Sequence, residues 1–90
     1  MSNLTDLMRA QDDLCIVYWF RNPDVRPHEV RTPALLDEAL LVARANAYRA
    51  GATEEQVKDC RDYARQLALR GRPPLALGMR TWDQFRKSLS

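Results

Sequence analysis

A break of only three residues, 50–52, separates two long helical patterns in the middle of this chain. Gly51 suits the left-handed conformation that commonly ends a helix. Thr53 and Gln56, three positions apart, form the capping-box pattern that begins the next helix. A connection this short between helices of similar length predicts an antiparallel hairpin over residues 32–71. We expect its two helices to pack back to back at the centre of the fold.

The first helix of the hairpin carries a stripe of small apolar residues. Thr32 offers a capping oxygen, and Pro33 fits the first helical position because its missing N–H would have had no partner there. At 3.6 residues per turn one face collects Leu36, Ala39, Leu40, Ala43, Ala47 and Ala50. Alanine lets a neighbouring backbone approach to the short end of the usual ~8–10 Å between helix axes. We therefore expect this helix to be the central one.

The second helix of the hairpin, about residues 54–70, is the clearest amphipathic segment of the chain. Its apolar face is made of Val57, Cys60, Tyr63, Ala64, Leu67 and Ala68. Its other face mixes acidic and basic side chains, which is typical of a surface in contact with water. Gly71 and the prolines that follow it predict the end of the helix.

Residues 3–21 are predicted to form a helix before the hairpin. Apolar residues first recur at helical spacing, and residues 14–20 are then seven apolar positions in succession. A helix buried on nearly all sides explains that run. A strand is the minor alternative, because its only nearby partner, residues 25–32, is interrupted by Pro27.

The C-terminal part repeats the capping-box pattern. Thr81 and Gln84 predict a short helix over residues 82–88, preceded by an apolar linker, residues 73–79, that we expect to lie across the hairpin. The fold class predicted from the sequence is all-α, a bundle of about four helices built on a central antiparallel helix hairpin, with α+β as the minor alternative. Residues 1–90 are expected to form one helical domain.

Composition excludes several classes of protein. The 90 residues carry a net charge of +2, and 46% of them are apolar, so the chain can bury one modest core. No stretch approaches the ~20 apolar residues of a membrane span. The N-terminus lacks the basic-then-apolar pattern of a signal peptide, and we expect a cytoplasmic protein. Cys15 and Cys60 fit buried free thiols that pack as small apolar groups.

Catalytic and metal-binding patterns are missing from the sequence. The three glycines, Gly51, Gly71 and Gly78, form no phosphate-binding loop. His28 is the only histidine, so neither a zinc ligand set nor a recognisable nucleophile–base pair can be assembled. The carboxylates of residues 54–66 alternate with basic side chains, as on a solvated helix face. We predict a protein that is not an enzyme, with no cofactor, metal or small-molecule substrate.

The turn of the hairpin resembles the helix-turn-helix DNA-binding motif. Ala47, then Gly51 four positions on, then Val57 six positions further carry the resemblance. It implies a DNA-binding transcriptional regulator whose second helix enters the major groove. The nucleic-acid contacts would then be Arg49, Lys58, Arg61 and Arg65. Glu54 and Glu55 begin that helix and would repel phosphates, so DNA binding is the alternative prediction.

Binding to another protein is the main functional prediction. Aromatic rings and arginines dominate interface hot spots, and we expect partner contacts at Tyr18, Trp19, Phe20, Trp82, Phe85 and Arg86. A bundle this small cannot cover all its apolar residues, so some of Trp19, Phe20, Leu41, Val42, Leu69 and Trp82 should stay exposed. Short arginine-rich chains without catalytic motifs are similar in type to phage accessory proteins that inhibit a host factor. We therefore predict an adaptor or inhibitor that binds a larger protein, with self-association as a homodimer as a further possibility.

Overall fold

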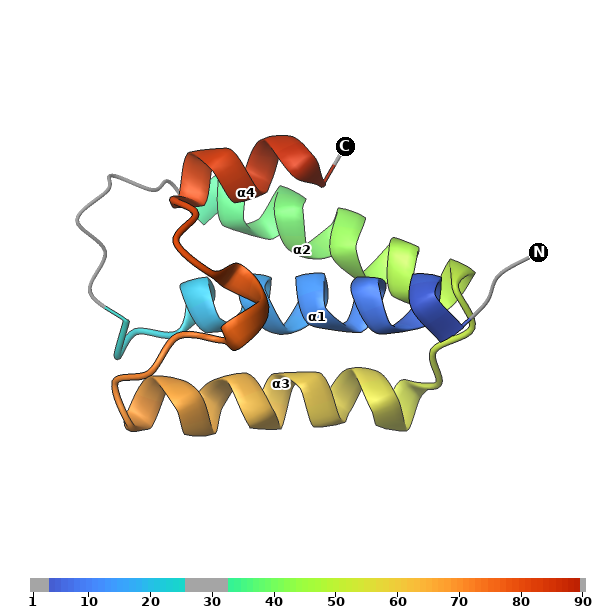
Figure 1. Ribbon diagram of the computed structural model, residues 1–90, viewed down its shortest axis with the longest axis horizontal. Coiled ribbons are helices and arrows are strands. Elements are labelled where there is room, and N and C mark those ends of the chain that lie inside the picture. Colours follow the sequence, from blue (N-terminus) through green and yellow to red (C-terminus); the bar gives the residue numbers. More distant parts are fainter. Residues whose placement is uncertain (1–3, 26–32, 90) are drawn as a thin grey trace.

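Every regular element is helical in the computed structural model, which describes residues 4–25 and 33–89 (Figure 1). The elements are α1 (Leu4–Arg21), α2 (Pro33–Arg49), α3 (Glu54–Leu69), a 3₁₀ turn η1 (Leu75–Leu77) and α4 (Trp82–Ser88). The all-α prediction is confirmed. The apolar run at residues 14–20 lies inside α1, which excludes the α+β alternative for that segment. The expected cap Thr32 and the histidine His28 lie outside the described residues.

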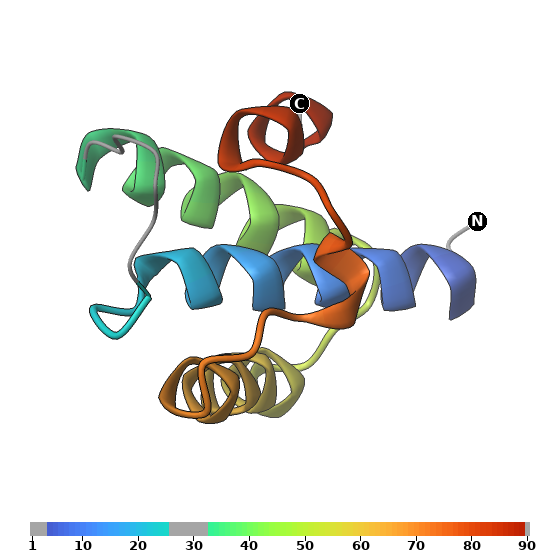
Figure 2. The same ribbon diagram turned by 60° about the vertical axis from the view of Figure 1, so that its left-hand side comes forward.

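The centre of the bundle is α1, not the hairpin. Figures 1 and 2 show α2 and α3 running in opposite directions, as predicted, but on either side of α1. The expectation that the two hairpin helices pack back to back, with α2 as the central helix, is wrong. The short turn fixes the relative direction of α2 and α3, whereas α1 is apolar all round at residues 14–17 and can bury two opposite sides at once.

The alanine stripe of α2 is buried as predicted, although against a different neighbour. Ala43 and Ala47 are fully buried and Ala39 is 5% exposed. Since α2 packs mainly on α1, these alanines set the close approach of those two helices. The predicted stripe is confirmed, and its partner is corrected from α3 to α1.

Both predicted capping boxes are present. The backbone N–H of Gln56 donates to Thr53 Oγ1 at 3.1 Å, and the N–H of Thr53 donates to Gln56 Oε1 at 2.8 Å. Thr81 and Gln84 repeat this pair at the start of α4. Gly51 has φ +104°, a conformation that other residues rarely adopt, so it makes the turn after α2.

The linker before α4 lies on α1 rather than across the hairpin, and it contains the turn η1, which the sequence did not predict (Figure 1). Leu77 and Pro74 are buried on its inner side. Arg80 holds its outer end: Nε donates to the carbonyl oxygen of Leu77 at 3.1 Å and Nη2 to that of Ala76 at 2.7 Å. The linker is therefore anchored at several points along its length.

Candidate interaction surfaces

Three of the aromatic residues predicted to contact a partner belong to the core. Phe20 is 7% exposed, Trp82 1% and Phe85 0%. The rings of Phe20 and Trp82 meet edge to face with centroids 5.0 Å apart, and Phe85 stacks on Phe20 at 6.3 Å. The assignment of these three residues to a partner surface is therefore corrected. Their rings join α4 to α1, because a seven-residue helix needs large side chains to hold it on the bundle.

The other three predicted contact residues lie partly at the surface. Tyr18 and Trp19 are half-buried and pack on the edge of the core, and the indole ring of Trp19 contacts Phe20 edge to face at 5.0 Å. Arg86 is also half-buried and lines a shallow groove between α2 and α4, together with Val42. Trp19 and Arg86 belong to separate elements, α1 and α4.

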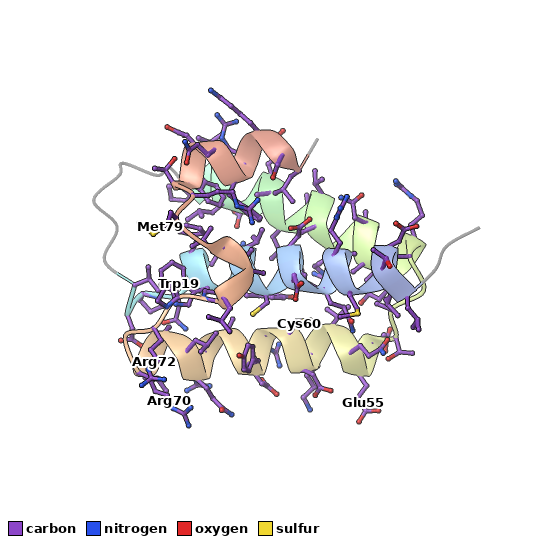
Figure 3. The ribbon with its side chains drawn as sticks, in the orientation of Figure 1. Trp19, Glu55, Cys60, Arg70, Arg72 and Met79 are labelled. Carbon is purple, nitrogen blue, oxygen red and sulfur yellow. The ribbon has the colours of Figure 1, made fainter. Side chains whose placement is uncertain are left out.

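The exposed apolar surface is mostly aliphatic. Leu41 is 68% exposed and Leu69 65%, and Val42 is exposed too, as expected for apolar residues that a small bundle cannot cover. Leu75 and Met79, at 95% and 99%, are more exposed than any of these. Both residues belong to the linker that was expected to lie across the hairpin, and neither was predicted to be exposed. Figure 3 shows Met79 projecting from the segment between η1 and α4.

A groove lies between α1, α3 and η1, and we call it the linker groove. Its volume is about 440 Å³. It is lined by Gln11, Asp12, Cys15, Gln56, Asp59, Cys60, Tyr63, Pro74, Leu75 and Ala76. Tyr63 and Leu75 are the exposed large apolar side chains of this lining. The groove thus combines apolar contact area with two carboxylates.

The two thiols of the linker groove are neutral. The pKa of Cys15 is raised to about 12, mainly by burial and to a smaller extent by the nearby Cys60 and Asp12. The pKa of Cys60 is raised as well, first by burial and then by Asp59 and Asp12. The Cys60 thiol donates to the backbone oxygen of Gln11 at 3.6 Å. The carboxylates of Asp12 and Asp59 therefore make the electrostatic potential inside the groove more negative. Such a potential favours the binding of a positively charged group.

The residues predicted to contact nucleic acid are all exposed. Arg49 ends α2, whereas Lys58, Arg61 and Arg65 lie on α3. The exposed side of α3 also carries Glu54, Glu55, Asp59 and Asp62. Its three basic residues are therefore interspersed with four acidic ones. Arg61 Nε lies 3.8 Å from Asp62 Oδ1, and Figure 3 shows Glu55 pointing away from the bundle at the start of α3.

Comparison with protein-family models, with curated proteins and with solved structures finds no match to this chain. Among residues 4–25 and 33–89, no three or more histidine, cysteine, aspartate or glutamate side chains gather in a way that could hold a metal ion. Within the same described ranges, no helix combines the length and the apolar character needed to cross a membrane.

Proposed function

We propose that this chain is a small non-enzymatic protein-binding module, an adaptor or inhibitor, that docks on a larger protein through the linker groove and the linker beside it. The observation that carries the proposal is the near-complete exposure of Leu75 and Met79 on an anchored turn. Full burial of one such side chain contributes about 1.5–3 kcal/mol. A partner that covers both would gain hot-spot contacts that the free chain leaves in water.

The linker is well suited to present these side chains because its backbone is already held. Leu77, the last residue of η1, is buried against the bundle, and Arg80 donates to the carbonyl oxygens of Ala76 and Leu77. Gly78, at φ +62°, makes the turn between Leu77 and Arg80. Docking would therefore order little more than the side chains of Leu75 and Met79, which keeps the entropic cost of binding low.

The charge of the groove indicates the chemistry of the partner. Asp12 and Asp59 are exposed and lie among its lining residues, where both raise the pKa of Cys60. A partner segment that places an apolar side chain between Tyr63 and Leu75, with a lysine or arginine beside it, would complement both the apolar and the acidic parts of the groove. We propose a basic–apolar segment of a larger protein as the occupant.

Two features support a non-enzymatic, cytoplasmic role. The Cys15 thiol, with a pKa of about 12, is not a nucleophile at neutral pH, because the thiolate is the reactive form. Cys15 and Cys60 are both free, as expected for a protein that works in a reducing compartment. We propose that the module acts in the cytoplasm.

Quantitative affinity capture from a lysate of the source cells tests the proposal. We expect a captured protein whose yield falls at least tenfold with the double variant Leu75→Glu/Met79→Glu. The matched control is the double variant Leu4→Glu/Leu69→Glu, which adds the same two charges at exposed leucines on α1 and α3 and should leave the yield unchanged. Equal capture by both variants, once each is shown to be folded, would contradict the proposal.

A DNA-binding regulator is the second candidate, and one observation favours it. Lys58, Arg61 and Arg65 are all exposed and follow one stripe of α3 at intervals of three and four residues. Binding to duplex DNA that weakens steeply with salt and is lost in Arg61→Glu/Arg65→Glu would support it. Capture that disappears on nuclease treatment would favour this candidate over the first.

A further inference from the structure

α2 is apolar on two opposite sides. Successive residues of a helix are 100° apart, so Ala39, Ala43 and Ala47 share one side, and that side is buried against the bundle. The opposite side carries a second apolar row, all of it exposed: Ala34, Leu41, Ala45 and Tyr48. Leu41 is 68% exposed at the middle of this row, which we call the outer face of α2.

We propose that the outer face of α2 binds a second copy of this chain, in an antiparallel pair whose two-fold axis passes beside Leu41. Ala34 and Tyr48 each lie seven residues from Leu41, one on either side. A two-fold axis at Leu41 therefore places the large ring of Tyr48 over the small Ala34 of the partner, twice. The two Leu41 side chains meet at the centre. At each end, the packing of Tyr48 against Ala34, a large side chain against a small one, fills the space between the helices.

The charges beside this row fit the same arrangement. Asp37 and Arg44 lie on one flank of Leu41, four residues before it and three residues after it. A perpendicular two-fold axis brings equal flanks together, so each Asp37 would lie beside the Arg44 of the other copy. Asp37 is already oriented by its ion pair with Arg21, and its two carboxylate oxygens can accept both arginines. The result is two symmetric pairs of opposite charges.

A parallel pair would not be complementary. A two-fold axis along the helices brings opposite flanks together, which places Asp37 beside Glu38 of the other copy. Two carboxylates at such a contact repel each other. The sequence of α2 therefore selects the antiparallel arrangement by charge as well as by size.

The size of the surface sets the expected strength. The 17 residues of α2 span roughly 25 Å, and one helix-on-helix contact buries less than a standard interface of about 1,600 Å². We infer a reversible dimer with a dissociation constant on the order of 1–100 µM. This surface lies on a different helix from the linker groove, so the inference stands independently of the proposed function.

Sedimentation velocity over a concentration series tests the dimer. We expect a monomer–dimer equilibrium that Leu41→Glu weakens at least tenfold, whereas Leu75→Glu, on the linker, leaves it unchanged. Arg44→Asp should weaken it by placing two aspartates together, and the double variant Asp37→Arg/Arg44→Asp should restore it by exchanging the charges. A protein that stays monomeric at about 1 mM, ten times the weakest expected constant, or a dimer indifferent to Leu41→Glu, would overturn the inference.

Cysteine cross-linking tests the direction of the pair. In an antiparallel dimer, Ala34→Cys mixed with Tyr48→Cys should form a mixed disulfide under mild oxidation with a disulfide reagent, and each variant alone should not. Leu69→Cys is the control for disulfides formed by random collision, because Leu69 is 65% exposed and lies on α3, outside the proposed contact. Cross-linking of Ala34→Cys with itself, in place of the mixed product, would show a parallel pair and overturn the proposed geometry.

Discussion

The guanidinium of Arg80 lies over the ring of Phe85, with its central carbon 5.5 Å from the ring centroid. The same side chain donates to the carbonyl oxygens of Ala76 and Leu77. Arg80 thus connects the end of η1 to the buried face of α4, two elements that the sequence alone left unrelated. This connection holds in place the turn that presents Leu75 and Met79.

Replacing Arg80 should therefore destabilise the protein. Arg80→Ala removes two hydrogen bonds from a charged donor and the contact with the ring of Phe85, and we expect the free energy of unfolding to fall by about 1.5–3 kcal/mol. Urea denaturation followed by circular dichroism measures the change. Arg70→Ala is the control, since Arg70 is exposed. Equal stability of the two variants would show that Arg80 holds nothing in place.

The close contact between α1 and α2 can be tested by enlarging an alanine. Ala43 is fully buried, and Ala43→Leu should overpack the contact and cost about 1–3 kcal/mol. Ala45 lies two residues on and is exposed, so Ala45→Leu should change the free energy of unfolding by less than ~0.5 kcal/mol. Thermal denaturation at a concentration low enough to keep the chain monomeric compares them. A tolerated leucine at position 43 would contradict the close approach of the two helices.

Asp13 should make stability depend on pH. Burial raises the pKa of its carboxyl group, and Asp12 raises it further, although Arg80 and Arg9 act in the opposite direction. A folded pKa above the unfolded value of 3.8 means that the ionised carboxylate disfavours folding at neutral pH. The penalty is lost as the pH falls through the folded pKa and is absent below 3.8.

Asp13→Asn should therefore be more stable than the wild type at pH 7, and its advantage should disappear at pH 3. Urea midpoints at the two pH values measure this difference. Asp62→Asn, at an exposed position of α3, should show no such advantage. A lower stability of Asp13→Asn at pH 7 would mean that the attraction to Arg80 outweighs burial.

Thiol labelling should separate the folded from the unfolded chain. With a pKa of about 12, about one Cys15 thiol in ten thousand is ionised at pH 8. In the variant Cys60→Ser, which leaves Cys15 alone, a disulfide reagent should react at least a hundredfold more slowly with the native protein than with protein in urea. Rapid labelling of the native variant would contradict the burial of Cys15 in α1.

The sequence predicted the helices and their ends because those depend on local chemistry. Thr53, Thr81 and Gly51 each fix a terminus through their own backbone or through a residue three positions away. The sequence-based prediction of the central helix was wrong, because a short turn determines the relative direction of two helices but not the distance between them. The apolar run at residues 14–20 was the available signal that α1 has neighbours on both sides.

The surface that we propose for docking was predicted only in part. Trp82 and Phe85 were assigned to a partner, but a short terminal helix needs them to pack against Phe20. Leu75 and Met79 were overlooked because helical periodicity says nothing about a linker. Their exposure depends on η1, whose position is set by the burial of Leu77 against residues far away in the sequence and by the hydrogen bonds that Arg80 donates to η1.

The most direct test of the central claim is hydrogen–deuterium exchange on the complex with the captured larger protein, compared with the free chain. Docking through the linker should slow backbone exchange in residues 73–80, which include Leu75 and Met79, and in the part of α3 around Tyr63. Exchange at the start of α2 should stay unchanged at concentrations that keep the chain monomeric. Protection confined to α2 or α4, with residues 73–80 exchanging as in the free chain, would contradict the account.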